Sequence, residues 1–186
     1  MFHYQSTIIY CLLVLWGLTE LFIKNKTSKN TSNHSKDQGT RYIIITSVVL
    51  SIAMLNNPIK PYLLPEWGIY LGIFLMIFGI IFRLYAIHYL GKAFTLNVQT
   101  TDTQKLISSG PYSLVRNPAY TGSILSILGL SFVTLNILSI LITLIILSIA
   151  YAIRIRTEER VLNQHFGEDY KDYCQKVRYR LFPFIW

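Results

Sequence analysis

The stretch NILSILITLIILSIAYAI, residues 136–153, decides the class of fold. It contains no charged side chain, and its length approaches the roughly 20 apolar residues that a helix needs to cross a bilayer. A second apolar run, SILSILGLSFV at residues 123–133, comes just before it. A soluble protein would have too little polar surface to coat a core around such runs. The sequence therefore predicts an integral membrane protein.

The composition of the whole chain agrees with this class. Of its 186 residues, 52% are hydrophobic and only 14% are charged. The length suggests a single domain, residues 1–186. Apolar runs predict an all-α protein with about five transmembrane helices, at residues 7–23, 42–55, 67–90, 119–133 and 137–155. The second and fourth runs are short, so these helices either extend into the flanking loops or cross a thinned membrane at a tilt.

The positions of the basic residues predict the orientation. Five of the 17 lysines and arginines lie in the first loop, three in the third loop, and seven at or after the last span. By the positive-inside rule, these segments are cytoplasmic and the N-terminus is outside. The net charge of +8 therefore fits membrane topology better than nucleic-acid binding, because the basic residues neither line one helix face nor alternate with aromatic residues.

The third loop ends in SSGPYSLVRNPAYTG, residues 108–122, a polar stretch that runs directly into the fourth apolar run. In one interpretation, Asn117 is the N-cap of that helix, Pro118 starts it, and Arg116 extends to lipid phosphate. In the other, the helix N-terminus facing the cytoplasm binds an anionic group. Spacing alone favours the first interpretation and leaves the second open. The end of the first loop, residues 37–41, likewise either begins a helix or contacts the other cytoplasmic segments.

The C-terminal region begins with RIRTEER, residues 154–160. Arg154 and Glu158 are four positions apart and so share one helix face. Charges at the end of a membrane helix are costly unless they are solvated, paired or bound to a ligand. Beyond them, apolar and aromatic residues recur at helical spacing before Pro183, which predicts a cytoplasmic amphipathic helical arm; they are Leu162, Phe166, Tyr170 and Tyr173.

The sequence carries no pattern typical of a metal site. His3, His34, His88 and His165 are scattered, and no two have ligand spacing. The two cysteines, Cys11 and Cys174, form no disulfide framework or metal knuckle. Arg83 and His88 are expected to line the cytoplasmic mouth of the helix bundle.

Four motifs occur in order on the predicted cytoplasmic side. They are Gly110-Pro-Tyr112, Arg116-Asn-Pro118-x-Tyr120-x-Gly122, Arg154-x-x-x-Glu158-Glu159, and Phe166-Gly167-x-x-Tyr170-x-x-Tyr173. As a set they resemble the isoprenylcysteine carboxyl methyltransferase family and its phospholipid methyltransferase relatives. The resemblance covers about residues 90–183. The family usually has His where this chain has Asn117, and Asn cannot titrate near neutral pH.

The resemblance implies an enzyme that uses S-adenosylmethionine as its cofactor. Carried over by position, the cofactor-binding candidates are Tyr112, Arg116, Asn117, Pro118, Tyr120, Glu158, Glu159 and Tyr170. A sulfonium cofactor with an amino-acid tail needs anionic groups near its cation and donors for its carboxylate, which these residues offer. Arg154 and Glu158 are the catalytic candidates, with Arg154 orienting the acceptor. No metal is expected.

The methyl acceptor implied by the resemblance is a lipophilic small molecule or a prenylated chain that enters from the lipid bilayer. The expected reaction is carboxyl or O-methylation of an isoprenoid-like or prenylcysteine-like substrate at the cytoplasmic face. Two alternatives stay open: N-methylation of a phospholipid amine, and a membrane scaffold that keeps the fold without catalysis. No motif lies in the spans that would form the acceptor pocket.

Overall fold

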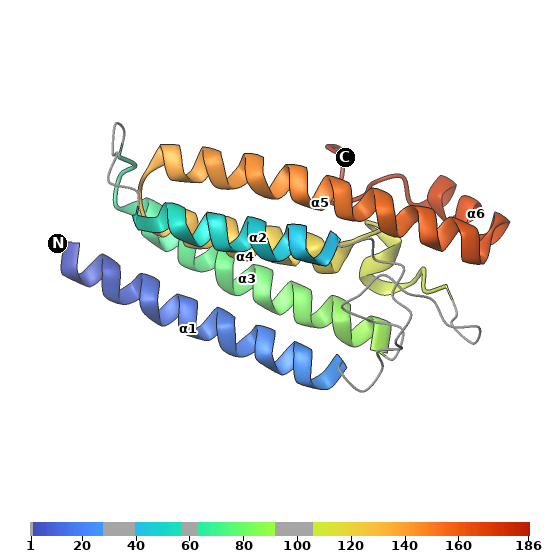
Figure 1. Ribbon diagram of the computed structural model, residues 1–186, viewed down its shortest axis with the longest axis horizontal. Coiled ribbons are helices and arrows are strands. Elements are labelled where there is room, and N and C mark those ends of the chain that lie inside the picture. The colour runs from blue at the N-terminus through green and yellow to red at the C-terminus, as the bar shows by residue number, and fades with distance from the viewer. Residues whose placement is uncertain (1, 28–39, 57–62, 92–105) are drawn as a thin grey trace.

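The computed structural model describes residues 2–27, 40–56, 63–91 and 106–186, and in these ranges the regular structure is helical, apart from one isolated β-bridge between Leu63 and Asn136. Figure 1 shows the long helices running side by side, with α6 and the C-terminal segment gathered toward one end. The elements are α1 (Phe2–Thr27), α2 (Thr40–Ala53), η2 (Met54–Asn56), α3 (Trp67–Leu90), η4 (Gly110–Ser113), α4 (Pro118–Val133), α5 (Ile137–Phe166) and α6 (Glu168–Lys176).

Three of the described helices are long and apolar enough to cross a membrane, namely residues 5–25 within α1, then α3 and α5. Helices α2 and α4 are apolar but shorter, with 14 and 16 residues. The described residues thus confirm the prediction of an all-helical protein with helices suited to a membrane. The count of five spans stays a prediction.

Helix α5 continues beyond the predicted span, which ends at residue 155, and runs to Phe166. Residues 156–166 contain Arg, Glu, Leu and Gln, which favour helix, and no Gly or Pro. The helix stops at Gly167, whose φ of 54° lies in the left-handed region that glycine adopts without steric cost. The chain turns there into α6.

Helices α3 and α4 pack against each other through glycines. A Cβ atom placed on Gly79 would lie 2.6 Å from the carbonyl oxygen of Gly122, and one placed on Gly129 would lie 2.5 Å from the backbone nitrogen of Met76. Small residues let membrane helices approach until backbone meets backbone, which gives dispersion contacts that lipid cannot replace. This pair therefore forms the rigid centre on which the start of α4 is held.

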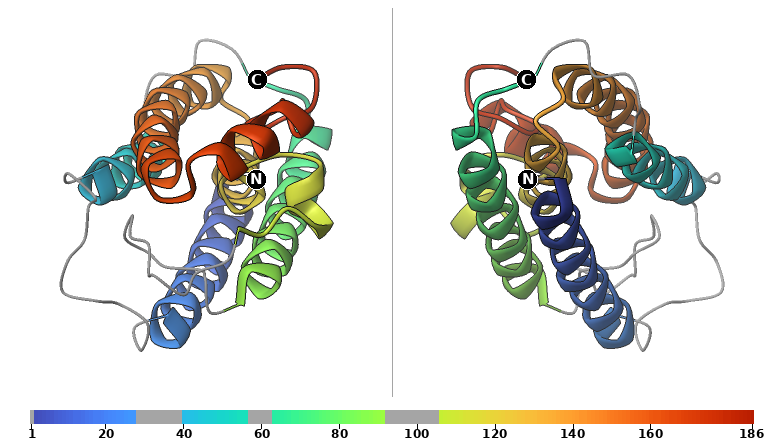
Figure 2. Two further views of the ribbon diagram at one scale, coloured as in Figure 1. Left: turned by 90° about the vertical axis from the view of Figure 1, so that its right-hand side faces the viewer. Right: turned by 90° about the vertical axis from the view of Figure 1, so that its left-hand side faces the viewer.

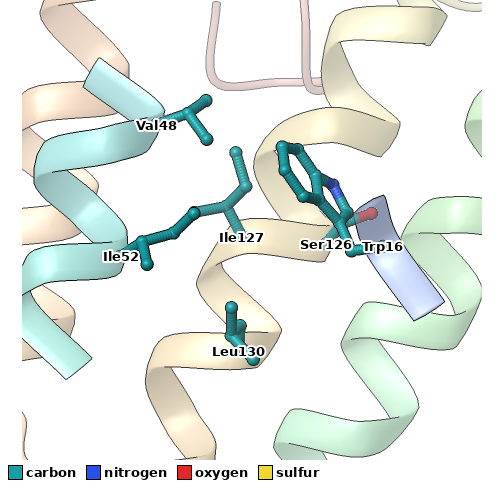
Figure 3. Close-up of a pocket in the computed structure, with 6 residues that line it drawn as sticks. All are labelled: Trp16, Val48, Ile52, Ser126, Ile127 and Leu130. Atoms are coloured by element: carbon teal, nitrogen blue, oxygen red, sulfur yellow. The ribbon is translucent and has the colours of Figure 1, made fainter. Parts of the chain in front are cut away.

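Helix α1 lies at the periphery, and a charged pair joins it to α3. The Arg83 guanidinium donates two hydrogen bonds to the carboxylate of Glu20. Arg83 is thus neutralised by a partner that the sequence pattern did not indicate. Helices α1, α2 and α4 also border a narrow apolar pocket, shown in Figure 3 and lined by Trp16, Val48, Ile52, Ser126, Ile127 and Leu130.

Candidate functional site

The C-terminal segment, residues 177–186 after α6, lies against the loop at residues 114–117 that precedes α4. The backbone N–H of Arg116 donates to the carbonyl of Tyr179, and that of Asn117 donates to the carbonyl of Arg180, both at 2.9 Å. One turn into α4, the Thr121 hydroxyl donates to the carbonyl of Leu181 at 2.7 Å. These bonds join two segments about sixty residues apart in the chain. The C-terminal segment therefore covers one side of the start of α4.

Asn117 occupies the N-cap position of α4, as predicted, but its side chain makes no capping hydrogen bond. Its amide nitrogen donates instead to the carbonyl of Arg180 at 3.2 Å. The expected side-chain cap is therefore wrong: the Asn117 side chain is held by its hydrogen bond to the C-terminal segment, and its oxygen accepts from none of the first N–H groups of α4. Pro118 is the first residue of α4 and is fully buried.

Two arginines converge on Glu159. Nη1 of Arg116 lies 2.9 Å from Oε1, while Arg180 approaches the same carboxylate side-on, with Nε at 3.0 Å and Nη2 at 2.9 Å. Paired guanidinium–carboxylate bonds of this kind fix orientation as well as charge. Arg116 also donates to the Cys174 sulfur at 2.9 Å. Its side chain is about nine-tenths buried, so the interpretation in which Arg116 extends to lipid phosphate is wrong.

Arg154 and Glu158 meet at a tyrosine. The Tyr120 hydroxyl donates to Oε2 of Glu158 at 2.7 Å and accepts from Nε of Arg154 at 3.2 Å. Arg154 is only 4% exposed, and its Nη1 donates to the hydroxyl of Thr40 at 2.8 Å. Thr40 is the first residue of α2, so the end of the first loop both begins a helix and contacts the other segments of the site.

The remaining aromatic candidates close the site on the α6 side. The Tyr173 hydroxyl donates to the carbonyl of Tyr112 at 2.8 Å, which links α6 to the η4 turn. Burial raises the pKa of the Tyr112 phenol, with a further contribution from Glu158, and burial together with Glu159 raises that of Tyr170. Burial also raises the pKa of Tyr173, although Arg116 opposes the shift. These phenols are therefore neutral donors at physiological pH.

Arg180 carries a permanent charge at the rim of this cluster. Its hydrogen bonds to Glu159 raise the pKa of its guanidinium, which outweighs the effect of burial. The guanidinium carbon also lies 5.3 Å from the ring centre of Trp186, within the range of a cation–π contact. Two arginines against one carboxylate leave an excess of positive charge beside the start of α4.

Similarity to known proteins identifies the family of this chain. The model of a family described as phospholipid methyltransferase matches residues 67–169. A protein of Oryza sativa subsp. indica named "Probable protein-S-isoprenylcysteine O-methyltransferase" is 33% identical over 162 residues, which cover 79% of this chain and 84% of the rice protein. The chain belongs to the isoprenylcysteine carboxyl methyltransferase family. Membership places it among the methyltransferases.

Two further relatives agree with this family. The protein-S-isoprenylcysteine O-methyltransferase of Saccharomyces cerevisiae is 32% identical over 148 residues, which cover 73% of this chain and 62% of the yeast protein. The solved structure of a eukaryotic intramembrane Ras methyltransferase, isoprenylcysteine carboxyl methyltransferase, matches with a TM-score of 0.61 at 26% identity. That match covers 77% of this chain and 52% of the solved one, so the chain spans about half the length of that protein.

The methyltransferase brings the predicted residues together in two linked groups. Arg154, Glu158 and Tyr120 form one, and Arg116 and Glu159 form the other, while Asn117, Pro118, Tyr112 and Tyr170 line the same end of the bundle. Arg180 and Cys174 were not predicted as members of the site, and Thr40 was included only in the alternative in which residues 37–41 contact the other cytoplasmic segments. Arg180 lies in RYRLFP, close to the last motif, and this proximity in the sequence was the available signal. Within the described residues, no three His, Cys, Asp or Glu side chains group as metal ligands.

Proposed function

We propose that the chain transfers a methyl group from S-adenosylmethionine to the carboxyl group of a lipophilic, prenylcysteine-like acceptor. The observation that carries this proposal is the meeting of Arg154 and Glu158 at the Tyr120 hydroxyl, next to the cluster of Arg116, Glu159 and Arg180. A cation able to hold a carboxylate and an anion able to face a sulfonium thus lie together at the end of the apolar helices.

The residues present fit the cofactor. Nε of Arg116 is buried and has no hydrogen-bond partner, which is true of no other buried side-chain nitrogen or oxygen in the described ranges. An unpaired buried donor is costly, and a carboxylate ligand would satisfy it. In this proposal Arg116 and the start of α4 hold the amino-acid tail, and the carboxylate of Glu158 faces the sulfonium. Tyr112 and Tyr170 line the base of the cofactor site.

S-adenosylmethionine supplies an electrophilic methyl group when it is bound. The protein's own contribution is then to align the acceptor with this methyl group and to exclude water from the site. It must also keep other charged groups from competing with the acceptor. Arg154 is suited to orient the acceptor carboxylate, because it is buried and fixed by Tyr120 and Thr40. A carboxylate acceptor is already an anion, so no side chain needs to remove a proton from it. Asn117, which does not titrate near neutral pH, is compatible with that chemistry.

The apolar part of the acceptor would come from the bilayer, in an orientation that puts the site and the C-terminus in the cytoplasm and the N-terminus outside. The distribution of lysines and arginines supports this orientation. The narrow pocket between α1, α2 and α4 (Figure 3) is lined mainly by apolar side chains, which suit the apolar part of such an acceptor. We take residues 1–186 as one methyltransferase domain with five spans, in which α2 and α4 are the short members.

Two measurements test the reaction. Calorimetry of the purified protein with S-adenosylmethionine separates an enzyme from a scaffold, since a scaffold would bind none at near-millimolar concentration. Lipid extracts incubated with the enzyme and labelled cofactor then identify the bond by mass spectrometry. We expect base-labile label, as in a methyl ester. Base-stable label in a phospholipid head group would instead indicate N-methylation, the reaction suggested by the description of the matching family model.

Single substitutions assign the roles. Arg116→Ala should weaken binding of S-adenosylmethionine, whereas Arg154→Ala should lower turnover more than cofactor affinity. Arg156 is the matched control for Arg154, because it lies two residues away on α5 and is exposed. Arg156→Ala should change neither quantity. Equal losses in the Arg154 and Arg156 variants would contradict the role given to Arg154.

A further inference from the structure

The last six residues, LFPFIW at 181–186, form a folded turn docked on membrane helices. The side chain of Leu181 is buried, and Phe182 and Trp186 pack with it against an apolar cluster of α4 and α5 that comprises Ile124, Ile127, Leu147, Tyr151 and Ile155. In Figure 1 the C-terminus lies beside α5, level with the end of α1 and the beginning of α2. This segment is thus at the height where α1 ends and α2 begins, which in a membrane protein is close to the interface.

Two side chains of this turn point away from the protein. Phe184 is 89% exposed and Ile185 is 80% exposed, more than any other large hydrophobic residue in the described ranges. The turn is closed by hydrogen bonds from the backbone N–H groups of Ile185 and Trp186 to the carbonyl of Phe182. Phe184 has a φ of 67°, a left-handed conformation that an aromatic residue rarely adopts. The backbone is therefore strained at the exposed apolar tip of the turn, which consists of Phe184 and Ile185.

The surroundings of the tip match the chemistry of a lipid surface. Lys176 and Arg178 are exposed just before it, and the ring of Tyr179 packs on that of Phe184 at 5.3 Å. Basic residues beside aromatic ones suit the boundary between acyl chains and anionic head groups. Figure 2 shows the C-terminus at the rim of the bundle, where no described helix covers it. A soluble partner would have to bind at the height of the membrane surface to reach it.

We propose that Phe184 and Ile185 insert into the lipid at the membrane interface, so that the bilayer holds the C-terminal segment against the candidate site. The segment is directly coupled to that site. Its backbone accepts hydrogen bonds from Arg116, Asn117 and Thr121, and Arg180 binds Glu159. Insertion of the tip therefore pre-organises one wall of the cofactor site, a consequence that rests on the proposed function. Insertion itself does not.

Photo-crosslinking tests the insertion. A benzophenone amino acid at position 184, in the full chain reconstituted into liposomes of anionic and neutral phospholipid, should give lipid adducts on irradiation, seen by mass spectrometry. The control is the same amino acid at Asp172, an exposed residue of α6, where lipid adducts should be at least about tenfold fewer. Equal lipid adducts at both positions, adducts between two copies of the chain, or none at position 184 would each overturn the insertion.

A second measurement tests the coupling. In lipid nanodiscs, the double variant Phe184→Ser with Ile185→Ser should bind S-adenosylmethionine about fivefold or more weakly than the unchanged protein. Phe74→Ser is the control, because Phe74 is also exposed and apolar but lies on α3, away from the segment. Unchanged affinity in the double variant would overturn the coupling. If the unchanged protein bound no cofactor, the coupling and the proposed function would both fail, while the crosslinks would still decide insertion.

Discussion

At the residue scale, the Tyr120 hydroxyl is the smallest group whose removal should disable the site. It is shared by Glu158 and Arg154, at 2.7 and 3.2 Å. Hydrogen bonds to charged groups contribute about 1.5–3 kcal/mol, which corresponds to about ten- to hundredfold in rate when the bond is needed in the transition state. We therefore expect Tyr120→Phe to lower the rate of methyl transfer by about that factor, measured with labelled S-adenosylmethionine in reconstituted membranes.

The matched control is Tyr85→Phe. This substitution removes the same hydroxyl oxygen from a tyrosine that is half exposed on α3, outside the site. It should leave the rate unchanged. If Tyr120→Phe also left the rate unchanged, then the bridge between Arg154 and Glu158 would be structural, and those two residues would not act together in catalysis.

The sequence predicted this group in part. Arg154 and Glu158 share a helix face by spacing, and Tyr120 belongs to a motif of the loop before α4. The spacing suggested that the two charged groups pair with each other, whereas the structure joins both to a tyrosine from another helix. Arg180 was not predicted as a member of the site, and a contact of residues 37–41, which include Thr40, was only one of two alternatives, because both residues reach the site through contacts between segments distant in the chain. Periodicity along one helix carries no information on such contacts.

At the element scale, the close approach of α3 and α4 should make Gly122 intolerant of any side chain. A Cβ atom there would lie 2.6 Å from the carbonyl oxygen of Gly79 and 2.7 Å from the backbone nitrogen of Arg83. Backbone atoms cannot yield without separating the helices, and overpacking of this kind costs about 1–3 kcal/mol or more. We expect Gly122→Val to lower the unfolding temperature in detergent, followed by intrinsic fluorescence, and to weaken cofactor binding because α4 carries the site.

Gly17 provides the control for Gly122, because a Cβ atom added to it would meet no neighbouring atom within 4 Å. Gly17→Ala should leave the unfolding temperature unchanged or slightly higher, since alanine favours helix over glycine by about 1 kcal/mol. An equal loss of stability in both variants would mean that any change in membrane glycines destabilises the protein, and the close packing of α3 on α4 would not be the cause.

The helices were predicted well where apolar residues define them and less well where polar residues continue them. The expected span at residues 67–90 coincides with α3, and the one at 119–133 begins one residue after α4 does. The expected span at residues 137–155 lies within α5, which continues to Phe166 because hydropathy ends near residue 155 while helix propensity does not. Hydropathy also could not predict the charged pair between Glu20 and Arg83, since a single Glu in an apolar run does not indicate its partner.

At the scale of the whole molecule, the fold gathers all the candidate site residues at one end, so the orientation in the membrane decides which compartment supplies the cofactor. Helix α3 begins at the end of the bundle opposite to α6 (Figure 1). Glu66, just before α3, and Arg178, just after α6, are both exposed. The excess of lysine and arginine at the α6 end predicts that this end is cytoplasmic. Cysteine substitutions at these two positions can therefore report the two sides separately.

We expect Glu66→Cys to react with a membrane-impermeant maleimide in intact cells, and Arg178→Cys to react only after permeabilisation or in inside-out vesicles. Maleimide requires a thiolate in contact with water, so only a cysteine on the accessible side reacts. The unchanged protein gives the background from Cys11, which lies within an apolar helix, and from Cys174, which is partly buried. The reverse pattern would put the site outside, where it would be separated from a cytoplasmic pool of S-adenosylmethionine, and would contradict the proposed function even if the isolated protein bound the cofactor.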